Sequence, residues 1–261
     1  MMKQNHPFHL VSINPWPILV ASATMFLMSG SIQWFNKTKS SLLSIGLLLM
    51  LITLIQWWRD IIRESNLLGD HPFSVMTGLQ MGMILFILSE ILFFASFFWA
   101  FFHCSISTDI ELGYNWPPKG VNPFSPFSIP LINTLILLSS GASITWAHHS
   151  ILMNNSSQTF FSLLLTFLLA IYFIILQAFE YMKAPFSIVD SIYGTTFFLT
   201  TGFHGLHVII GSMMILTTLI RHMKNQFSKF HHFMFEAAAW YWHFVDVIWL
   251  FLFLFMYWWA Y

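Results

Sequence analysis

The fold is decided by residues 84–103, which read ILFILSEILFFASFFWAFFH. Apart from Ser89, Ser96, Glu90 and the terminal His103, every residue of this run is apolar. An α-helix of about 20 apolar residues is long enough to cross the hydrocarbon core of a membrane. A membrane β-strand would instead alternate apolar and polar residues over about ten positions. The run therefore predicts a membrane-spanning helix that carries one carboxylate.

The composition extends this prediction to the whole chain. Of its 261 residues, 57% are hydrophobic and only 8% are charged, whereas soluble domains carry roughly 25% charged residues. Such a chain cannot cover a water-facing surface, so we expect an integral membrane protein. The formal net charge is zero, and nothing in it indicates a nucleic-acid partner.

The sequence contains seven apolar runs of spanning length, joined by short polar links. They are residues 16–34, 42–58, 79–102, 129–147, 160–179, 192–220 and 233–257. Continuous apolar runs predict helices rather than barrel strands, because a helix satisfies its own backbone in lipid. We expect an all-α membrane protein with residues 1–261 in a single domain.

The distribution of Lys and Arg predicts the orientation of the chain. Loops on the inner side of a membrane carry an excess of these residues. With the N-terminus inside, the inner side holds Lys3, Arg59, Arg63, Arg221, Lys224 and Lys229, and the outer side holds Lys37, Lys39, Lys119 and Lys183. The bias is small, but it favours an inner N-terminus and, with seven spans, an outer C-terminus. The first fifteen residues lack the pattern of a signal or transit peptide.

Glu90 is the first candidate functional residue. A charge at the centre of a membrane helix costs about 2.5–3.5 kcal/mol on insertion scales, so we expect Glu90 to face other helices or to be protonated. One interpretation is a proton-relay group. The other, which we favour slightly, is a neutral carboxyl that is hydrogen-bonded between helices.

Two further segments carry polar residues inside predicted spans. TGFHGLHVIIG (201–211) places His204 and His207 three residues apart, on one helix face. FEAAAWYWHFVDVIWLFLF (235–253) places Glu236, His243 and Asp246 on one side of a helix. These residues could bind a metal or haem, but we favour a polar network that links the helices. Separately, His148 and His149 in WAHHS lie at a span end; adjacent residues point about 100° apart on a helix, so chelation of one ion by both is not expected.

Charged residues gather at the membrane edge after the second predicted span. QWWRDIIRES holds Arg59, Asp60, Arg63 and Glu64, and Asp60 and Arg63 have the spacing of a helical ion pair. Arginine can bind a lipid phosphate through two hydrogen bonds, and basic pockets suit anionic head groups. The alternative is a simple topology signal.

The motifs taken together resemble a known family. QWWRDIIRES, MILFILSEILFFASFFWAFFH, WPPKG, SITWAHHS, FEY–APF, TGFHGLHVIIG and FEAAAWYWHFVDVIWLFLF are similar, in order, to the subunit III family of cytochrome c oxidases in its mitochondrial form. The likeness runs from about Pro7 to Trp259.

This resemblance implies a fold and a set of partners. It implies two N-terminal helices (about 16–66) splayed from a five-helix bundle (about 73–259), with phospholipids in the cleft between them. It implies that haem and copper belong to the partner subunits, so this chain would bind no metal or other cofactor except structural phospholipids. The implied partners are subunits I and II and accessory subunits. The implied location is the mitochondrial inner membrane, with the N-terminus in the matrix and the C-terminus towards the intermembrane space.

The resemblance also implies roles for individual residues. Glu90 matches a membrane-embedded glutamate that lies towards subunit I and supports proton uptake, and no catalytic residue is implied. The implied lipid-binding residues are Trp58, Arg59, Arg63, Glu64, His71, Arg221 and Lys224. The polar network of His204, His207, Glu236, His243 and Asp246 becomes the favoured interpretation of those residues. Two other functions stay open from the residues alone: a self-contained membrane metalloenzyme, and a proton-coupled transporter with Glu90 as the coupling acid.

Overall fold

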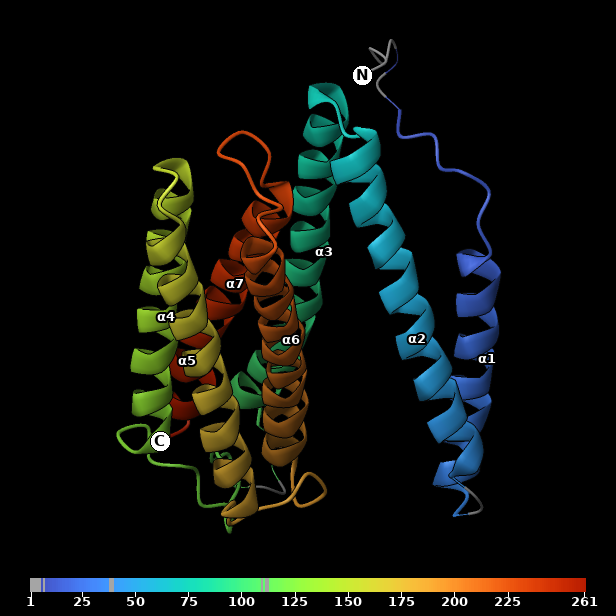
Figure 1. The fold of residues 1–261 in the computed structure, drawn as a ribbon. Coiled ribbons are helices and arrows are strands. Elements are labelled where there is room, and N and C mark those ends of the chain that lie inside the picture. Colours follow the sequence, from blue (N-terminus) through green and yellow to red (C-terminus); the bar gives the residue numbers. More distant parts are fainter. Residues whose placement is uncertain (1–5, 7, 38–39, 109, 111–112) are drawn as a thin grey trace. The chain divides into compact units, whose positions relative to one another are not determined.

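The computed structural model describes residues 6, 8–37, 40–108, 110 and 113–261. Lys3 and Lys39, used above for orientation, lie outside the described residues. The helices are α1 (Trp16–Phe35), α2 (Ser41–Arg63), α3 (Phe73–Ile106), α4 (Ile129–Leu152), α5 (Ser156–Met182), α6 (Ile192–Met223) and α7 (Phe233–Leu252), with π-helical turns η1 (Glu64–Leu68) after α2 and η3 (Phe253–Trp258) after α7. Figure 1 traces them in chain order. Seven helical segments are long and apolar enough to cross a membrane, which confirms the predicted all-α class.

The second helix continues beyond its predicted end. The apolar run stops at Trp58, but the helix continues through the charged residues to Leu68. Charged side chains are compatible with a helix, so the helix can continue beyond the apolar layer of the membrane. The chain turns at Gly69, whose φ of 73° is left-handed, a conformation that glycine adopts without steric cost. The segment predicted as a polar link is therefore mostly helical.

Residues 1–79 form one compact unit, in which α1 pairs closely with α2. Gly30 and Gly46 lie where the two backbones touch: a Cβ on Gly46 would be 2.6 Å from the backbone nitrogen of Leu27, and one on Gly30 would clash with the backbone of Leu43. Small residues allow this close approach in membranes. At the other end of the pair, the indole Nε1 of Trp16 donates to Oδ2 of Asp60 over 2.8 Å. The pair is therefore fixed at both ends.

Residues 80–261 form the second unit, in which α4 packs closely on α5 and α7. Small hydroxyl side chains bond across the α4–α5 contact, where Ser143 Oγ lies 2.8 Å from Thr166 Oγ1. Across the α4–α7 contact, Trp242 donates to Ser140 Oγ over 2.9 Å, and Trp249 donates to Thr134 Oγ1 over 3.0 Å. These bonds satisfy polar atoms that lipid could not, while the large indoles fill the core.

The part of α3 in this second unit contacts the bundle through aromatic side chains. Phe93 stacks edge-on against Phe203 of α6 at 5.1 Å between ring centroids, and Phe98 packs on Phe255 of η3 at 5.7 Å. Rings of this size hold the α3 backbone away from its neighbours. The contact face repeats at about every third or fourth residue of α3, which is the helical period, and Glu90 lies on it.

Candidate functional site

Glu90 contacts a histidine of α6. Its Oε2 lies 3.0 Å from Nε2 of His207, and both side chains are largely buried. The other ring nitrogen of His207, Nδ1, lies 2.6 Å from the carbonyl oxygen of Phe203. A carbonyl only accepts hydrogen bonds, so Nδ1 carries a proton and donates it. The Glu90–His207 contact must then hold one further proton, on the carboxyl or on Nε2.

Aromatic rings surround the His207 ring of this pair. Phe94 lies edge-on to the His207 ring at 5.0 Å, and the Tyr241 ring stacks on it at 6.2 Å. Phe93 and Phe244 lie at 6.2 and 6.3 Å. An apolar enclosure strengthens the hydrogen bond and makes an unpaired charge costly. The arrangement can therefore hold a proton between two groups and move it from one to the other.

The five residues of the expected polar network contact different neighbours. His204 is buried, with Nε2 at 3.2 Å from the carbonyl oxygen of Val245. Asp246 is buried beside Gly141, where a Cβ would lie 2.9 Å from Oδ2. His243 is exposed, and Glu236 forms its polar contacts with residues outside this set of five. Within the described part of the chain, no hydrogen bond or ion pair joins two of the five.

The membrane-edge residues of the first unit form ion pairs with one another. Arg59 and Arg63 lie 3.3 and 3.7 Å from Oδ1 of Asp60, which confirms the predicted Asp60–Arg63 pair. Glu64 contacts His9 at 3.0 Å, and the rings of His9 and His71 lie 4.9 Å apart. Trp58 and both arginines have substantial exposed surface, so their outer faces are accessible to a ligand.

The two basic residues of the second unit differ. Arg221 is buried: its Nε donates to Gln226 over 3.1 Å, and its guanidinium lies 4.8 Å from the centre of the Phe227 ring. Lys224 is the C-cap of α6 and is exposed. Arg221 therefore organises the end of α6, whereas the ammonium of Lys224 is accessible to a ligand.

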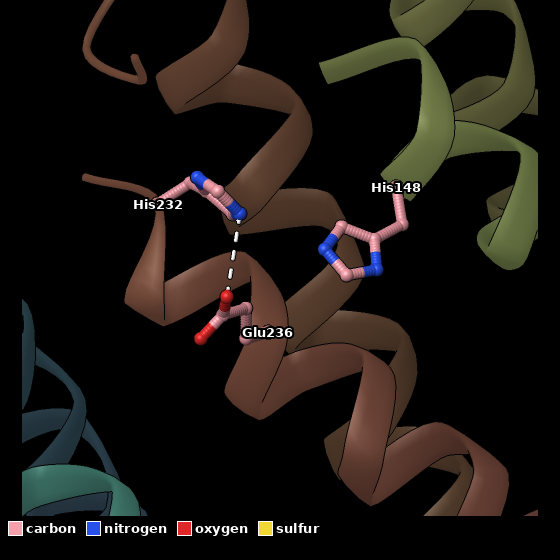
Figure 2. Close-up of side chains that lie close together, drawn as sticks. All are labelled: His148, His232 and Glu236. Atoms are coloured by element: carbon pink, nitrogen blue, oxygen red, sulfur yellow. Dashed lines mark ion pairs between the residues drawn. The ribbon is translucent and has the colours of Figure 1, made fainter. Parts of the chain in front are cut away.

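A cluster of two histidines and a glutamate lies where α4 ends and α7 begins. His148, His232 and Glu236 point toward one another (Figure 2), and each offers one atom within 4.8 Å of the others. His232 Nε2 lies 3.3 Å from Glu236 Oε1. Among the residues that the structure describes, this is the one group of three such side chains close enough to hold a metal ion. Sequence reasoning did not group these residues.

Another buried carboxylate was not predicted from the sequence. Glu180 of α5 is 1% exposed and accepts a hydrogen bond from the hydroxyl of Tyr257 over 2.7 Å. Its other oxygen, Oε2, has no hydrogen-bond partner in the described chain. The signal was present in the sequence: FEYM puts an acid near the end of an apolar run, whereas Glu90 interrupts the middle of one.

Comparison with known proteins assigns the family. The family model described as Cytochrome c oxidase subunit III matches residues 6–261. The chain belongs to the cytochrome c oxidase subunit III family. It is 59% identical over 256 residues to cytochrome c oxidase subunit 3 of Drosophila melanogaster, with 98% of each chain covered. It is 58% identical to the protein of Pelomedusa subrufa and 55% identical to that of Petromyzon marinus, each over 260 residues and 100% of both chains.

Membership of the subunit III family confirms the resemblance drawn from the sequence motifs. The match covers both the paired helices α1 and α2 and the bundle that holds Glu90. The family name describes a subunit of an oxidoreductase complex. The roles of single residues in this chain rest on the contacts described above.

Proposed function

We propose that this chain is a core subunit without redox centres in a respiratory cytochrome c oxidase, which reduces oxygen to water with electrons from cytochrome c and pumps protons. In this proposal the haem and copper lie in partner subunits I and II. The chain stabilises subunit I in the mitochondrial inner membrane, with its N-terminus in the matrix and its C-terminus towards the intermembrane space. Family membership over nearly the whole chain supports the assignment to the complex.

The Glu90–His207 pair carries the proposed role in proton uptake. Its 3.0 Å contact holds one proton in an apolar enclosure, and the outward apolar faces of α3 around it, such as Leu88 and Leu92, are exposed in the isolated chain. A partner helix can therefore pack beside the carboxyl. We infer that the pair supports proton entry in that neighbour and takes no part in oxygen chemistry.

The α6 histidines form contacts that join α6 to other helices. Both ring nitrogens of His207 already contact acceptors, and Nε2 of His204 contacts a backbone carbonyl. These side chains serve as links between helices.

The exposed arginines at the end of α2 support lipid binding. Arg59 and Arg63 share one carboxylate, Asp60, so their guanidinium groups retain donors for a phosphate. Trp58 beside them is 54% exposed, and tryptophan favours the head-group level of a membrane. We propose that this edge, together with Glu64 and His71, binds a phospholipid head group. Lys224, at the helix end that Arg221 organises, serves a second one.

Purification of the complex through a tag on this chain tests the assignment. We expect haem- and copper-bearing subunits to co-purify with it and the preparation to reduce oxygen. A tagged chain that purifies alone, or that itself retains haem or copper after separation from its partners, contradicts the proposal.

Lipid analysis of the purified complex tests the proposed head-group binding. Arg59→Ala with Arg63→Ala should lower the amount of bound phospholipid, whereas Lys229→Ala is the matched control. Full lipid retention in the double variant would count against head-group binding.

A further inference from the structure

The cluster at the end of α4 and the start of α7 has the composition of a metal site. His148 lies in the last part of α4, His232 is the N-cap of α7, and Glu236 lies in its first turn. Imidazole nitrogen and carboxylate oxygen are the ligands of zinc sites with two histidines and one glutamate. The spacing of His232 and Glu236, four residues apart, brings both onto one face of the helix.

One ring nitrogen of His232 faces away from Glu236 and forms a hydrogen bond. Nδ1 lies 3.0 Å from the carbonyl oxygen of Ser228, so Nδ1 carries a proton and donates it. Nε2 then either carries a second proton or presents a lone pair. It is buried without a hydrogen-bond partner, and it faces Glu236 Oε1 at 3.3 Å. Two lone pairs at that distance repel unless a proton or a cation lies between them.

Glu236 is positioned by a residue of α3. The side-chain amide of Gln80 donates to Glu236 Oε2 over 3.1 Å. Together with the bond from His232 to Ser228, this gives two of the three candidate ligands an outer partner. Ligating histidines and carboxylates usually have such partners, which fix ring orientation and raise ligand basicity.

His148 completes the cluster from the neighbouring helix. Its ring lies 5.6 Å from the His232 ring and 5.6 Å from the Phe235 ring. One ring nitrogen faces the His232–Glu236 pair (Figure 2). Phe235 is fully buried and supports the ring from the side, so His148 is held close to the pair.

We propose that His148, His232 and Glu236 bind a divalent zinc-class ion, with water completing its coordination. Metal–ligand bonds of about 2.0–2.2 Å in a tetrahedron place ligand atoms about 3.4 Å apart. His232 and Glu236 already have this separation, at 3.3 Å, and a side-chain rotation of His148 closes the rest of the 4.8 Å spread. Imidazole ligands favour zinc over magnesium or calcium.

The ion would join α4 to α7. It would lie between His232 and Glu236 in place of a proton, form a bond to each, and add a third bond to a residue of another helix. The inference is independent of the proposed function, because it concerns the chain's own side chains. It departs from the expectation that this chain binds no metal, which concerned His204, His207, His243 and Asp246.

Zinc binding to the purified complex that contains this chain tests the proposal. Radioactive Zn²⁺ is equilibrated with the wild-type complex and with complexes carrying single substitutions. We expect His148→Gln and Glu236→Gln each to lose one equivalent of bound zinc that the wild type holds. Gln80→Ala should weaken the same site by about tenfold or more, as loss of an outer partner does.

The adjacent histidine provides the matched control. His149→Gln removes an imidazole one residue away, outside the cluster, and should bind zinc as the wild type does. Equal zinc binding by the wild type, His148→Gln and Glu236→Gln overturns the proposal, as does an equal loss in His149→Gln. If a variant does not assemble, anomalous diffraction at the zinc edge from wild-type crystals soaked in Zn²⁺ decides: a peak among the three side chains supports the site, and its absence refutes it.

Discussion

Glu90 on α3 and His207 on α6 form a contact of 3.0 Å that holds a single proton between a carboxylate oxygen and a ring nitrogen. The carbonyl of Phe203 occupies the other ring nitrogen, so the pair has two arrangements, one neutral and one ionic. Transfer of that proton between the two atoms would change the charge of the carboxyl on α3. A carboxyl inside an apolar helix is therefore accommodated by one partner.

Replacement of Glu90 by Gln tests whether its role in the α3–α6 contact can be distinguished from its role in holding a proton. In Glu90→Gln the amide can still donate to Nε2 of His207, so the α3–α6 contact persists. We expect a fully assembled complex whose oxygen consumption with reduced cytochrome c falls by less than about tenfold. Normal assembly with complete loss of oxygen reduction would show that Glu90 is catalytic.

The companion substitution Glu90→Leu tests the contact itself. It leaves Nε2 of His207 buried without a partner, which costs about 1–3 kcal/mol. We expect less of the chain to remain in the complex on heating than in Glu90→Gln. Equal thermal retention of the two variants would mean that the bond to His207 contributes nothing to stability.

The glycine contact between α1 and α2 gives a further prediction. A Cβ on Gly46 would lie 2.6 Å from the backbone of Leu27, so Gly46→Ala must push the two helices apart. Overpacking of this kind costs about 1–3 kcal/mol or more, and we expect heat to release the chain from the complex at a lower temperature. Gly82→Ala is the control, since a Cβ there meets nothing within 4 Å. Equal melting of the two variants would refute the close contact.

The helices could be predicted from the sequence because lipid leaves the backbone few alternatives. Every long apolar run became a helix. The ends were less predictable: α2 continues past Trp58 to η1, and α3 begins at Phe73 rather than Leu79. Hydropathy reports where the apolar layer ends, whereas hydrogen bonding and turn residues such as Gly69 determine where a helix ends.

The site was only partly predictable because its partners come from distant segments. Glu90 stood out as a charge in an apolar run, but sequence could not pair it with His207. The geometry of adjacent histidines predicts that His148 and His149 point apart, but it gives no sign of Glu236 across the helix contact. Such pairings depend on which helices are neighbours, which one sequence does not encode locally.

Asp190 gives a prediction about pH in the loop between α5 and α6. Its Oδ2 accepts a 2.7 Å hydrogen bond from the backbone amide of Ser187, and this bond lowers the pKa of Asp190 below its ordinary value. A lowered carboxyl pKa stabilises the fold above the ordinary value, and the effect is lost as pH falls through the lowered one. We expect protection of the Ser187 amide, measured by hydrogen exchange relative to the intrinsic rate, to persist at neutral pH and disappear in acid.

Asp190→Asn is the control for that titration. Its amide oxygen can accept the same bond but does not ionise, so protection should be weaker and independent of pH over this range. A variant with the same acid-dependent loss as the wild type would assign the titration to another group.

The bond between Tyr257 and Glu180 gives the last prediction. Both side chains are buried. The Tyr257 hydroxyl donates a hydrogen bond to Glu180 Oε1, and Oε2 has no hydrogen-bond partner within the described chain. Tyr257→Phe keeps the ring and removes the donor, so it leaves a buried carboxyl without a partner and should cost about 1–3 kcal/mol. Tyr172→Phe is the matched control, because Tyr172 is 50% exposed on α5. Thermal release of the chain from the complex measures the stability of both single variants.

The double variant Tyr257→Phe with Glu180→Leu tests the reason for the loss. It should restore stability, because replacing both partners by apolar groups removes the unsatisfied carboxyl. A double variant no more stable than Tyr257→Phe would mean that the single substitution acts through packing rather than through the lost bond.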